Sequence, residues 1–262
     1  MIAGSSLLYT RYDFPEACAR LADAGFDAVD VGAIEGWAHV DPSAVVADPD
    51  AAAERVGRAC ERAAVSPVAL NAGCGDVTPD EEVRQVAAIA VLADAVGADA
   101  LTLPAAGVDA DVDADLDRFR RLVDATDDAD VALTVETHYD TLTEDPEVAG
   151  RYAAVSGLGL TLDPSHFAVG PYWDRGYDDL LPAAEHVHLR QSGASWAAVQ
   201  RPPGDGRVDF DRLFDALAGV GYDGHFSVEY IDSLDGIDPV EAEAAAVGMR
   251  ELAEEGWCRR GT

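Results

Sequence analysis

The sequence contains no lysine, so all 18 of its basic residues are arginines. No side-chain amine is therefore present to form a Schiff base with a carbonyl substrate. Carbonyl chemistry in this protein must therefore use a metal ion or hydrogen-bond donors.

Long apolar runs and paired cysteines are also missing. The longest uninterrupted apolar stretch, Val86 to Ala93, is far shorter than the roughly 20 residues that cross a bilayer. The N-terminus has no basic segment followed by an apolar one, so we predict no signal peptide. Because the four cysteines show no CxxC spacing, we expect reduced thiols in a cytoplasmic protein and no zinc site built on cysteine.

The charge balance is strongly acidic, with 18 basic against 50 acidic residues and a formal net charge of −32. Such a surface repels nucleic acid and anionic membranes, so we expect neither as a partner. The simplest hypothesis is adaptation to a salt-rich cytoplasm, where ions screen the self-repulsion. Most acidic residues are then solvated surface and say nothing about catalysis.

Strand-like and helix-like stretches alternate along the chain. Strands are expected at Ile2–Ser5, Ala28–Gly32, Val68–Asn71, Ala100–Leu103, Val131–Glu136, Gly159–Asp163, His186–Arg190 and Phe226–Tyr230. Helices are expected at Phe14–Ala24, Ala51–Ala64, Pro79–Val96, Val112–Ala125, Asp145–Ala154, Asp174–Ala184, Phe210–Ala218 and Pro239–Glu255, with stops at Gly25, Gly97 and Gly219. This alternation predicts an α/β fold, a single (β/α)8 TIM barrel over residues 1–262. A doubly wound open sheet is the alternative, but no GxGxxG follows the first strand.

Four of the expected strands end at a residue that commonly binds metals: Glu136, Asp163, His188 and Glu229. In each strand, the residues that share the ligand's face are small or polar, and those on the opposite face are large and apolar. Side chains alternate between the two faces of a strand, so this parity directs all four ligands to the inside of the barrel. They lie at the carboxyl ends of the strands, which is the catalytic end of such barrels.

Three carboxylates and an imidazole cannot crowd together in apolar surroundings without a compensating cation. Hard oxygen donors with one imidazole favour Mn²⁺, with Mg²⁺, Co²⁺ or Zn²⁺ as alternatives. Two open positions on such an ion would take adjacent oxygens of an α-hydroxy-carbonyl compound, and the ion would stabilise an enediolate formed by proton loss beside the carbonyl. For any single carboxylate, a helix cap or a surface salt bridge is the alternative.

Further residues are expected around this site. His166 follows Asp163 after a proline-containing turn, while Arg190 and His138 share a strand face with His188 and Glu136. These three would contact substrate oxygens, with an ion pair as the alternative for Arg190 and a capping role for His166. Additional substrate contacts are expected from residues in loops or strand ends at the same mouth: Asn71, Trp37 and Trp173. An isolated tryptophan can equally serve packing.

The spaced segments "TVETH", "LDPSH", "VHLR", "GDGRVDF" and "SVEY" resemble those of the sugar-phosphate isomerase/epimerase family with a xylose isomerase-like barrel. The resemblance implies a divalent metal held by Glu136, Asp163, His188 and Glu229, and a small carbohydrate substrate. It also implies that Glu136 and Glu229 act as acid and base on opposite faces of the substrate, and that His166 binds a substrate oxygen. The epimerase branch has a further arginine a few residues beyond the histidine of the seventh barrel strand, and residues 192 to 200 contain none.

Three alternatives stay open at this stage. An inosose-type dehydratase would use the same metal site and the same enolisation. An endonuclease IV-like DNA repair nuclease shares the barrel and the four ligands, but its metal cluster needs further histidines where Asn71 and Pro104 stand. A non-catalytic metal-binding barrel is the third. The sequence does not define an oligomeric state, and a homo-oligomer is an expectation by fold analogy alone.

Overall fold

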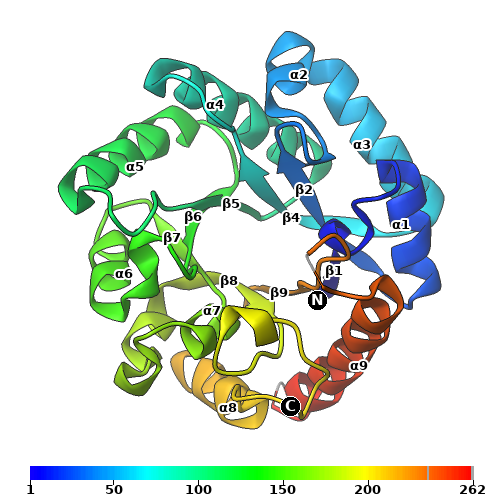
Figure 1. Cartoon of the computed structure of the whole chain (residues 1–262). Coiled ribbons are helices and arrows are strands. Elements are labelled where there is room, and N and C mark those ends of the chain that lie inside the picture. The colour runs from blue at the N-terminus through cyan, green and yellow to red at the C-terminus, as the bar shows by residue number, and fades with distance from the viewer. Residues whose placement is uncertain (235, 261–262) are drawn as a thin grey trace.

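Eight parallel strands close into a barrel in the computed structural model, which describes residues 1–234 and 236–260 (Figure 1). The strands are β1 (Ile2–Ser5), β2 (Ala28–Ile34), β4 (Ser66–Gly73), β5 (Ala100–Pro104), β6 (Ala132–Glu136), β7 (Gly159–Leu162), β8 (Ala184–Leu189) and β9 (His225–Val228). Each pairs with its neighbour in parallel, and β1 pairs with both β2 and β9, which closes the ring. A short β3 (Ala38–His39) is antiparallel to β2. The prediction of a single (β/α)8 barrel is confirmed.

Helices form an outer ring around the strands (Figure 1). The α-helices are α1 (Phe14–Asp23), α2 (Pro42–Ala47), α3 (Pro49–Ala63), α4 (Pro79–Val96), α5 (Val112–Thr126), α6 (Pro146–Ala153), α7 (Pro164–Val169), α8 (Phe210–Val220) and α9 (Pro239–Cys258). Short 3-10 turns are η1 (Ser6–Tyr9), η2 (Leu142–Glu144), η3 (Trp173–Arg175), η4 (Asp178–Ala183) and η5 (Trp196–Ala198). The sequence encodes several helix ends directly. At the start of α4, for example, the Thr78 side chain accepts from the Glu81 amide, and the helix ends at Gly97 with a φ of 77°.

Two expectations about helices were wrong. The helix expected at Asp174–Ala184 is replaced by η3 and η4, because Gly176 between them is left-handed (φ 72°) and Pro182 lacks an amide hydrogen. Gly219 lies inside α8, and the stop falls at Gly221, which has the left-handed conformation (φ 77°). A left-handed residue at this position accommodates the turn that ends the helix.

The strands have two different faces, as parity predicted. Leu101, Leu133 and Leu160 point outward and belong to the main apolar core under the helices. On the inner face, the hydroxyls of Thr102, Thr134 and Thr161 form a fully buried layer, which we call the threonine layer, with oxygen–oxygen distances of 2.7 to 3.2 Å.

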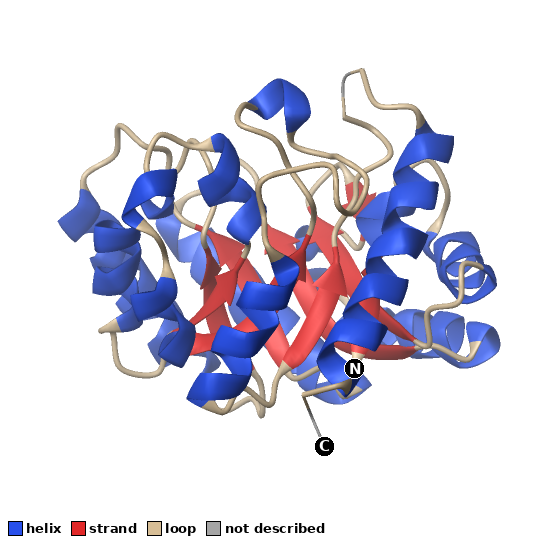
Figure 2. Cartoon of the chain, turned by 90° about the horizontal axis from the view of Figure 1, so that it is seen from below, coloured by secondary structure: helices blue, strands red, loops and turns tan. Residues whose placement is uncertain are grey.

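Loops extend further beyond one end of the barrel than beyond the other in the side view (Figure 2). The N-terminus lies at the opposite end, so the long loops follow the carboxyl ends of the strands. In barrels of this type the carboxyl end carries the active site. None of the described helices is both long enough and apolar enough to cross a bilayer.

Candidate metal centre

The structure brings the four predicted ligands together at the carboxyl end of the barrel. Glu136 ends β6, His188 lies on β8, and Asp163 and Glu229 directly follow β7 and β9. Each offers one ligand atom within 4.8 Å of the others, and all four side chains are buried. We call this group the quartet.

Donors from His188, Asn71 and Arg190 bridge the carboxylates of the quartet. His188 Nδ1 lies 2.9 Å from Glu136 Oε1 and 3.5 Å from Glu229 Oε1. The Asn71 side-chain amide donates to Glu229 Oε1 over 3.0 Å. Arg190 Nη2 lies 2.8 Å from Asp163 Oδ2, and its Nη1 lies 3.3 Å from Glu229 Oε2.

The charges of the quartet fit a divalent cation. Three carboxylates face one guanidinium, that of Arg190, which leaves two negative charges when His188 is neutral. The donor set of carboxylate oxygens with one imidazole is a set that Mn²⁺ and Mg²⁺ accept. The four residues of the quartet are therefore suited to hold a divalent metal ion.

Proton affinities inside the quartet respond to this excess of negative charge. Burial alone would lower the pKa of His188, but Glu229, Asp30 and Glu136 raise it well above its ordinary value. Burial raises the pKa of Glu229, and the charge of Glu136 adds to the increase. Burial also opposes ionisation of Glu136, but the hydrogen bond from His188 lowers the pKa of this carboxyl below its usual value. Without a metal, the protein therefore keeps a proton on His188, between the carboxylates.

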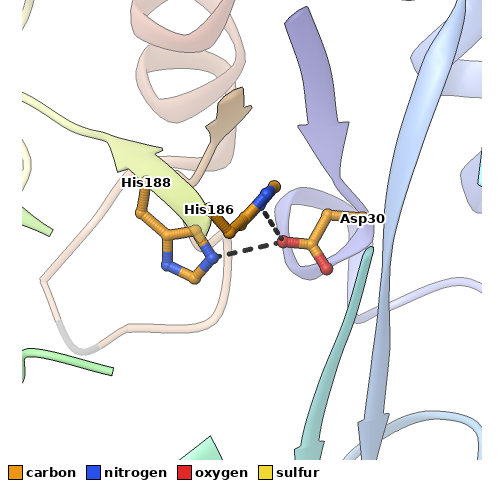
Figure 3. A group of neighbouring side chains, drawn as sticks. All are labelled: Asp30, His186 and His188. Atoms are coloured by element: carbon orange, nitrogen blue, oxygen red, sulfur yellow. Dashed lines mark ion pairs between the residues drawn. The ribbon is translucent and has the colours of Figure 1, made fainter. Parts of the chain in front are cut away.

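A second buried group lies deeper in the barrel, and sequence reasoning missed its carboxylate. Asp30 on β2 points across the barrel toward His186 and His188 on β8 (Figure 3). Its Oδ2 is 3.3 Å from His188 Nε2 and 3.7 Å from His186 Nε2. The parity of β2 could have found it, since Val29 and Val31 belong to the outer apolar core and Asp30 therefore points inward.

His166 on α7 is held by Arg190. The guanidinium Nη2 donates to His166 Nε2 over 2.7 Å, and Nε donates to Ser165 Oγ over 3.1 Å. Burial, with the charges of His138 and Arg190, lowers the pKa of His166 well below its ordinary value, so the ring is neutral. Because a guanidinium only donates, Nε2 must accept and Nδ1 carries the hydrogen. This Nδ1 has no hydrogen-bond partner among the described residues, so it is free to donate to a ligand.

A cavity of about 270 Å³ opens over the quartet. Two of its polar lining residues, Glu136 and Glu229, belong to the quartet, whereas Asp163 and His188 are not among the lining residues. The other polar lining residues are Asn71, His138, His166 and Arg190. The apolar lining includes Leu7, Ile34, Ile231, Leu234, Trp37 and Trp196.

Three aromatic rings, those of His138, His166 and Trp196, lie against one another at the cavity. The His138 ring lies 3.8 Å from the His166 ring between centroids, and Trp196 on η5 stacks on His166 at 6.1 Å. Trp196 was not predicted; its signal was its place in the loop after the β8 strand that carries His188. Trp173, which was expected at this mouth, lies on η3 beside Tyr177 and under the Arg207 guanidinium. It is not among the described residues that line the cavity.

The fold is a (β/α)8 barrel, and the buried group at the carboxyl ends of its strands could hold a metal ion. A model of the family "Xylose isomerase-like TIM barrel" matches residues 18–254. The chain belongs to this family.

Solved structures of similar fold cover nearly the whole chain. A xylose isomerase-like TIM barrel protein from Mycobacterium smegmatis, in complex with magnesium, has a TM-score of 0.81 at 17% identity, covering 100% of this chain and 97% of its own. The 3-keto-D-glucoside 4-epimerase from E. coli has a TM-score of 0.71 at 18% identity, covering 96% of this chain and 98% of its own. A probable 3-DHS dehydratase from Bacillus anthracis has a TM-score of 0.68 at 14% identity, covering 93% of this chain and 97% of its own. At these identities the likeness shows the fold. No curated protein matches the sequence.

Proposed function

We propose that the protein is a divalent-metal-dependent isomerase or epimerase of an uncharged keto-sugar or a related polyol. One observation carries the proposal: the quartet lies under a small cavity, and two of its carboxylates, Glu136 and Glu229, line that cavity. Epimerases among the structures of similar fold support this reaction class.

Glu136, Asp163, His188 and Glu229 would hold the cation. When bound, it would supply positive charge beside the carbonyl and hydroxyl oxygens of the substrate. We propose Mn²⁺ as the resident ion, on the basis of the donor set. Asn71 keeps Glu229 in place through its hydrogen bond.

The two glutamates carry the proton transfer in this proposal. One carboxylate takes the proton from the carbon beside the substrate carbonyl, and the electron pair of that C–H bond moves toward the carbonyl oxygen. In an epimerase, the other glutamate returns a proton to the same carbon from the opposite face, and the carbonyl re-forms. In an isomerase, the proton returns to the former carbonyl carbon. The proton of the neighbouring hydroxyl passes to the former carbonyl oxygen, so that the hydroxyl becomes the new carbonyl. His166 Nδ1–H donates to a substrate oxygen throughout.

The cavity favours an uncharged substrate about the size of a monosaccharide. Its volume of about 270 Å³ lies just below the range for small-molecule sites, about 300–1,000 Å³. Arg190 is the only arginine among the described residues that line it, and Asp163, Glu229, His166 and Ser165 already engage its nitrogens. A phosphate or carboxylate group would therefore find no free guanidinium to pair with. The apolar lining and the two tryptophans suit the C–H faces of a sugar.

Solvent deuterium exchange tests the proposed function. Free ketoses, inososes and hydroxypyruvate are each incubated with Mn²⁺-loaded protein in D₂O, and NMR follows deuterium at the carbon beside the carbonyl. We expect exchange with a free ketose and none with hydroxypyruvate, which is an anion. Absence of exchange from the whole panel would refute the proposal, and loss of water from an inosose would redirect it to a dehydratase.

The acidic composition and the cysteines support a proposal about the setting of the protein. We propose a salt-rich cytoplasm, because the net charge of −32 destabilises the folded state unless ions screen it. The four cysteines are free, and three of them are buried. Thermal unfolding at increasing KCl should show a rising midpoint, and a midpoint that does not rise would contradict this proposal.

A further inference from the structure

Asp30 is a fully buried carboxylate, and neither of its oxygens has a hydrogen-bond partner among the described residues. Burying a charge without a partner is costly. The burial of this carboxylate inside the barrel therefore needs a physical explanation, and the side chains that face it provide one.

Two imidazoles from β8 face this carboxylate (Figure 3). His188 Nε2 is 3.3 Å from Asp30 Oδ2, and this nitrogen likewise has no other hydrogen-bond partner among the described residues. His186 Nε2 is more distant from Asp30, at 3.7 Å, and lies 2.7 Å from Ser227 Oγ. The Nε2–H of His188 is therefore the donor best placed to meet Asp30.

The opposite nitrogen of the same ring faces the quartet. His188 Nδ1 lies 2.9 Å from Glu136 Oε1 and 3.5 Å from Glu229 Oε1. One imidazole therefore joins two buried groups, with Asp30 at Nε2 and the glutamates at Nδ1. A neutral imidazole has one hydrogen, so the group that binds Nε2–H decides which nitrogen can bind a metal.

We infer that Asp30 is a positioning residue for the metal centre: it holds the hydrogen of His188 on Nε2 and so leaves the Nδ1 lone pair for the cation. Its negative charge also strengthens His188 as a ligand. Carboxylates that accept from metal-binding histidines act in this way in other metal sites. The inference rests on the proposed function only in assuming that the quartet binds a cation.

A second cation, held by Asp30, His186 and His188, is the competing explanation, because these residues also offer ligand atoms within 4.8 Å of one another. That site would contain one carboxylate, where the quartet contains three. It would also require His188 to bind two ions through both nitrogens and so to lose both hydrogens. The number of ions bound separates the two explanations.

Mn²⁺ titration of Asp30 variants tests the inference. We expect Asp30→Ala to weaken Mn²⁺ binding about 10–100-fold with one ion still bound per chain. The Mn²⁺ affinity of Asp30→Asn should lie between those of Asp30→Ala and the unmodified protein, because an amide oxygen accepts the Nε2–H but lacks the charge. Asp30→Asn preserves the shape of the side chain, so it serves as the decisive variant should Asp30→Ala not fold, with circular dichroism as the check.

Thr134→Val is the matched control. Thr134 is also fully buried on the inner face of the barrel, but its hydroxyl contacts Thr102 and Thr161 and none of the quartet. Mn²⁺ affinity should not change in this variant. Unchanged affinity in both folded Asp30 variants would overturn the inference, as would two ions in the unmodified protein and one in the Asp30 variants.

The hydrogen on His188 can be observed directly. In Mg²⁺-loaded protein labelled with ¹⁵N-histidine, long-range ¹H–¹⁵N correlations should show His188 with its hydrogen on Nε2. A hydrogen on Nδ1 would overturn the inference. Both readouts are independent of turnover, so a failed exchange assay with intact metal linkage to Asp30 would reject the proposed reaction and leave this inference standing.

Discussion

Two buried polar groups lie inside the same barrel, and they are built in opposite ways. The threonine layer is neutral, and the Thr134 hydroxyl lies within hydrogen-bond distance of Thr102 and Thr161. The quartet is charged, with three carboxylates and too few donors to balance them. Asp30 faces His188 Nε2 over 3.3 Å, and neither of its oxygens makes a regular hydrogen bond within the described residues.

The difference separates a region whose polar groups are paired with one another from a region whose negative charges are not balanced. Satisfied neutral groups can fill a barrel interior at little cost, whereas unbalanced buried carboxylates are destabilising unless a cation joins them. The threonine layer therefore serves structure, and the quartet with Asp30 has the character of a binding site. Substitutions in the two regions should have different consequences.

The largest expected effect is on catalysis, from Glu136→Gln. An amide cannot take a proton from carbon, so deuterium exchange into the best ketose should fall about 10²–10⁴-fold, measured at saturating Mn²⁺. Thr102→Val, in the threonine layer, should keep the exchange rate of the unmodified protein. Equal losses in the two variants would contradict the division between the regions.

Metal affinity should depend on pH through the quartet. The raised pKa of His188 in the metal-free protein means that a cation must displace a proton from this ring. Affinity should therefore fall as pH falls below that pKa, by about tenfold per pH unit for one displaced proton, and should level off above it. Calorimetric Mn²⁺ titrations in buffers of different ionisation enthalpy would measure the proton release. A pH-independent affinity would contradict the role of His188.

Trp196→Ala should have a smaller effect, confined to substrate binding. The indole stacks on His166 at the cavity wall, and aromatic contacts of this kind contribute about 0.5–1.5 kcal/mol. We expect KM for the ketose to rise about 2–10-fold with kcat nearly unchanged. Trp173→Ala is the matched control, because Trp173 lies apart from the cavity lining and should leave KM unaltered.

Substitution in the threonine layer should affect function least, and its effect should be on stability. Thr134→Val removes a buried hydroxyl from the threonine layer and should cost about 1–3 kcal/mol of unfolding free energy, because its neighbours lose a partner. Urea unfolding would measure this change. A stability loss accompanied by loss of metal binding would show that the two regions are coupled.

Much of this architecture could be predicted from the sequence. Alternation of strands and helices gave the barrel, and strand parity placed Glu136, Asp163, His188 and Glu229 on one inner rim, because side-chain direction in a strand follows from residue number. The same rule applied to β2 would have found Asp30.

What the sequence could not define depends on the loops. Trp196 reaches the cavity and Trp173 does not, and no periodicity sets the path of the segments that carry them. Arg190 contacts Asp163, Glu229 and His166, and the sequence likewise does not predict these three-dimensional contacts. These contacts restrict the proposed substrate to an uncharged one, because they leave no free guanidinium for an anionic group.

The metal content of purified protein tests the central claim most directly. Elemental analysis after dialysis against Mn²⁺ should find one ion per chain, and Glu229→Gln and His188→Ala should each lose it, whereas Thr134→Val should retain it. Retention of the ion in both quartet variants would contradict the account, and three ions per chain would favour a nuclease-type cluster in its place.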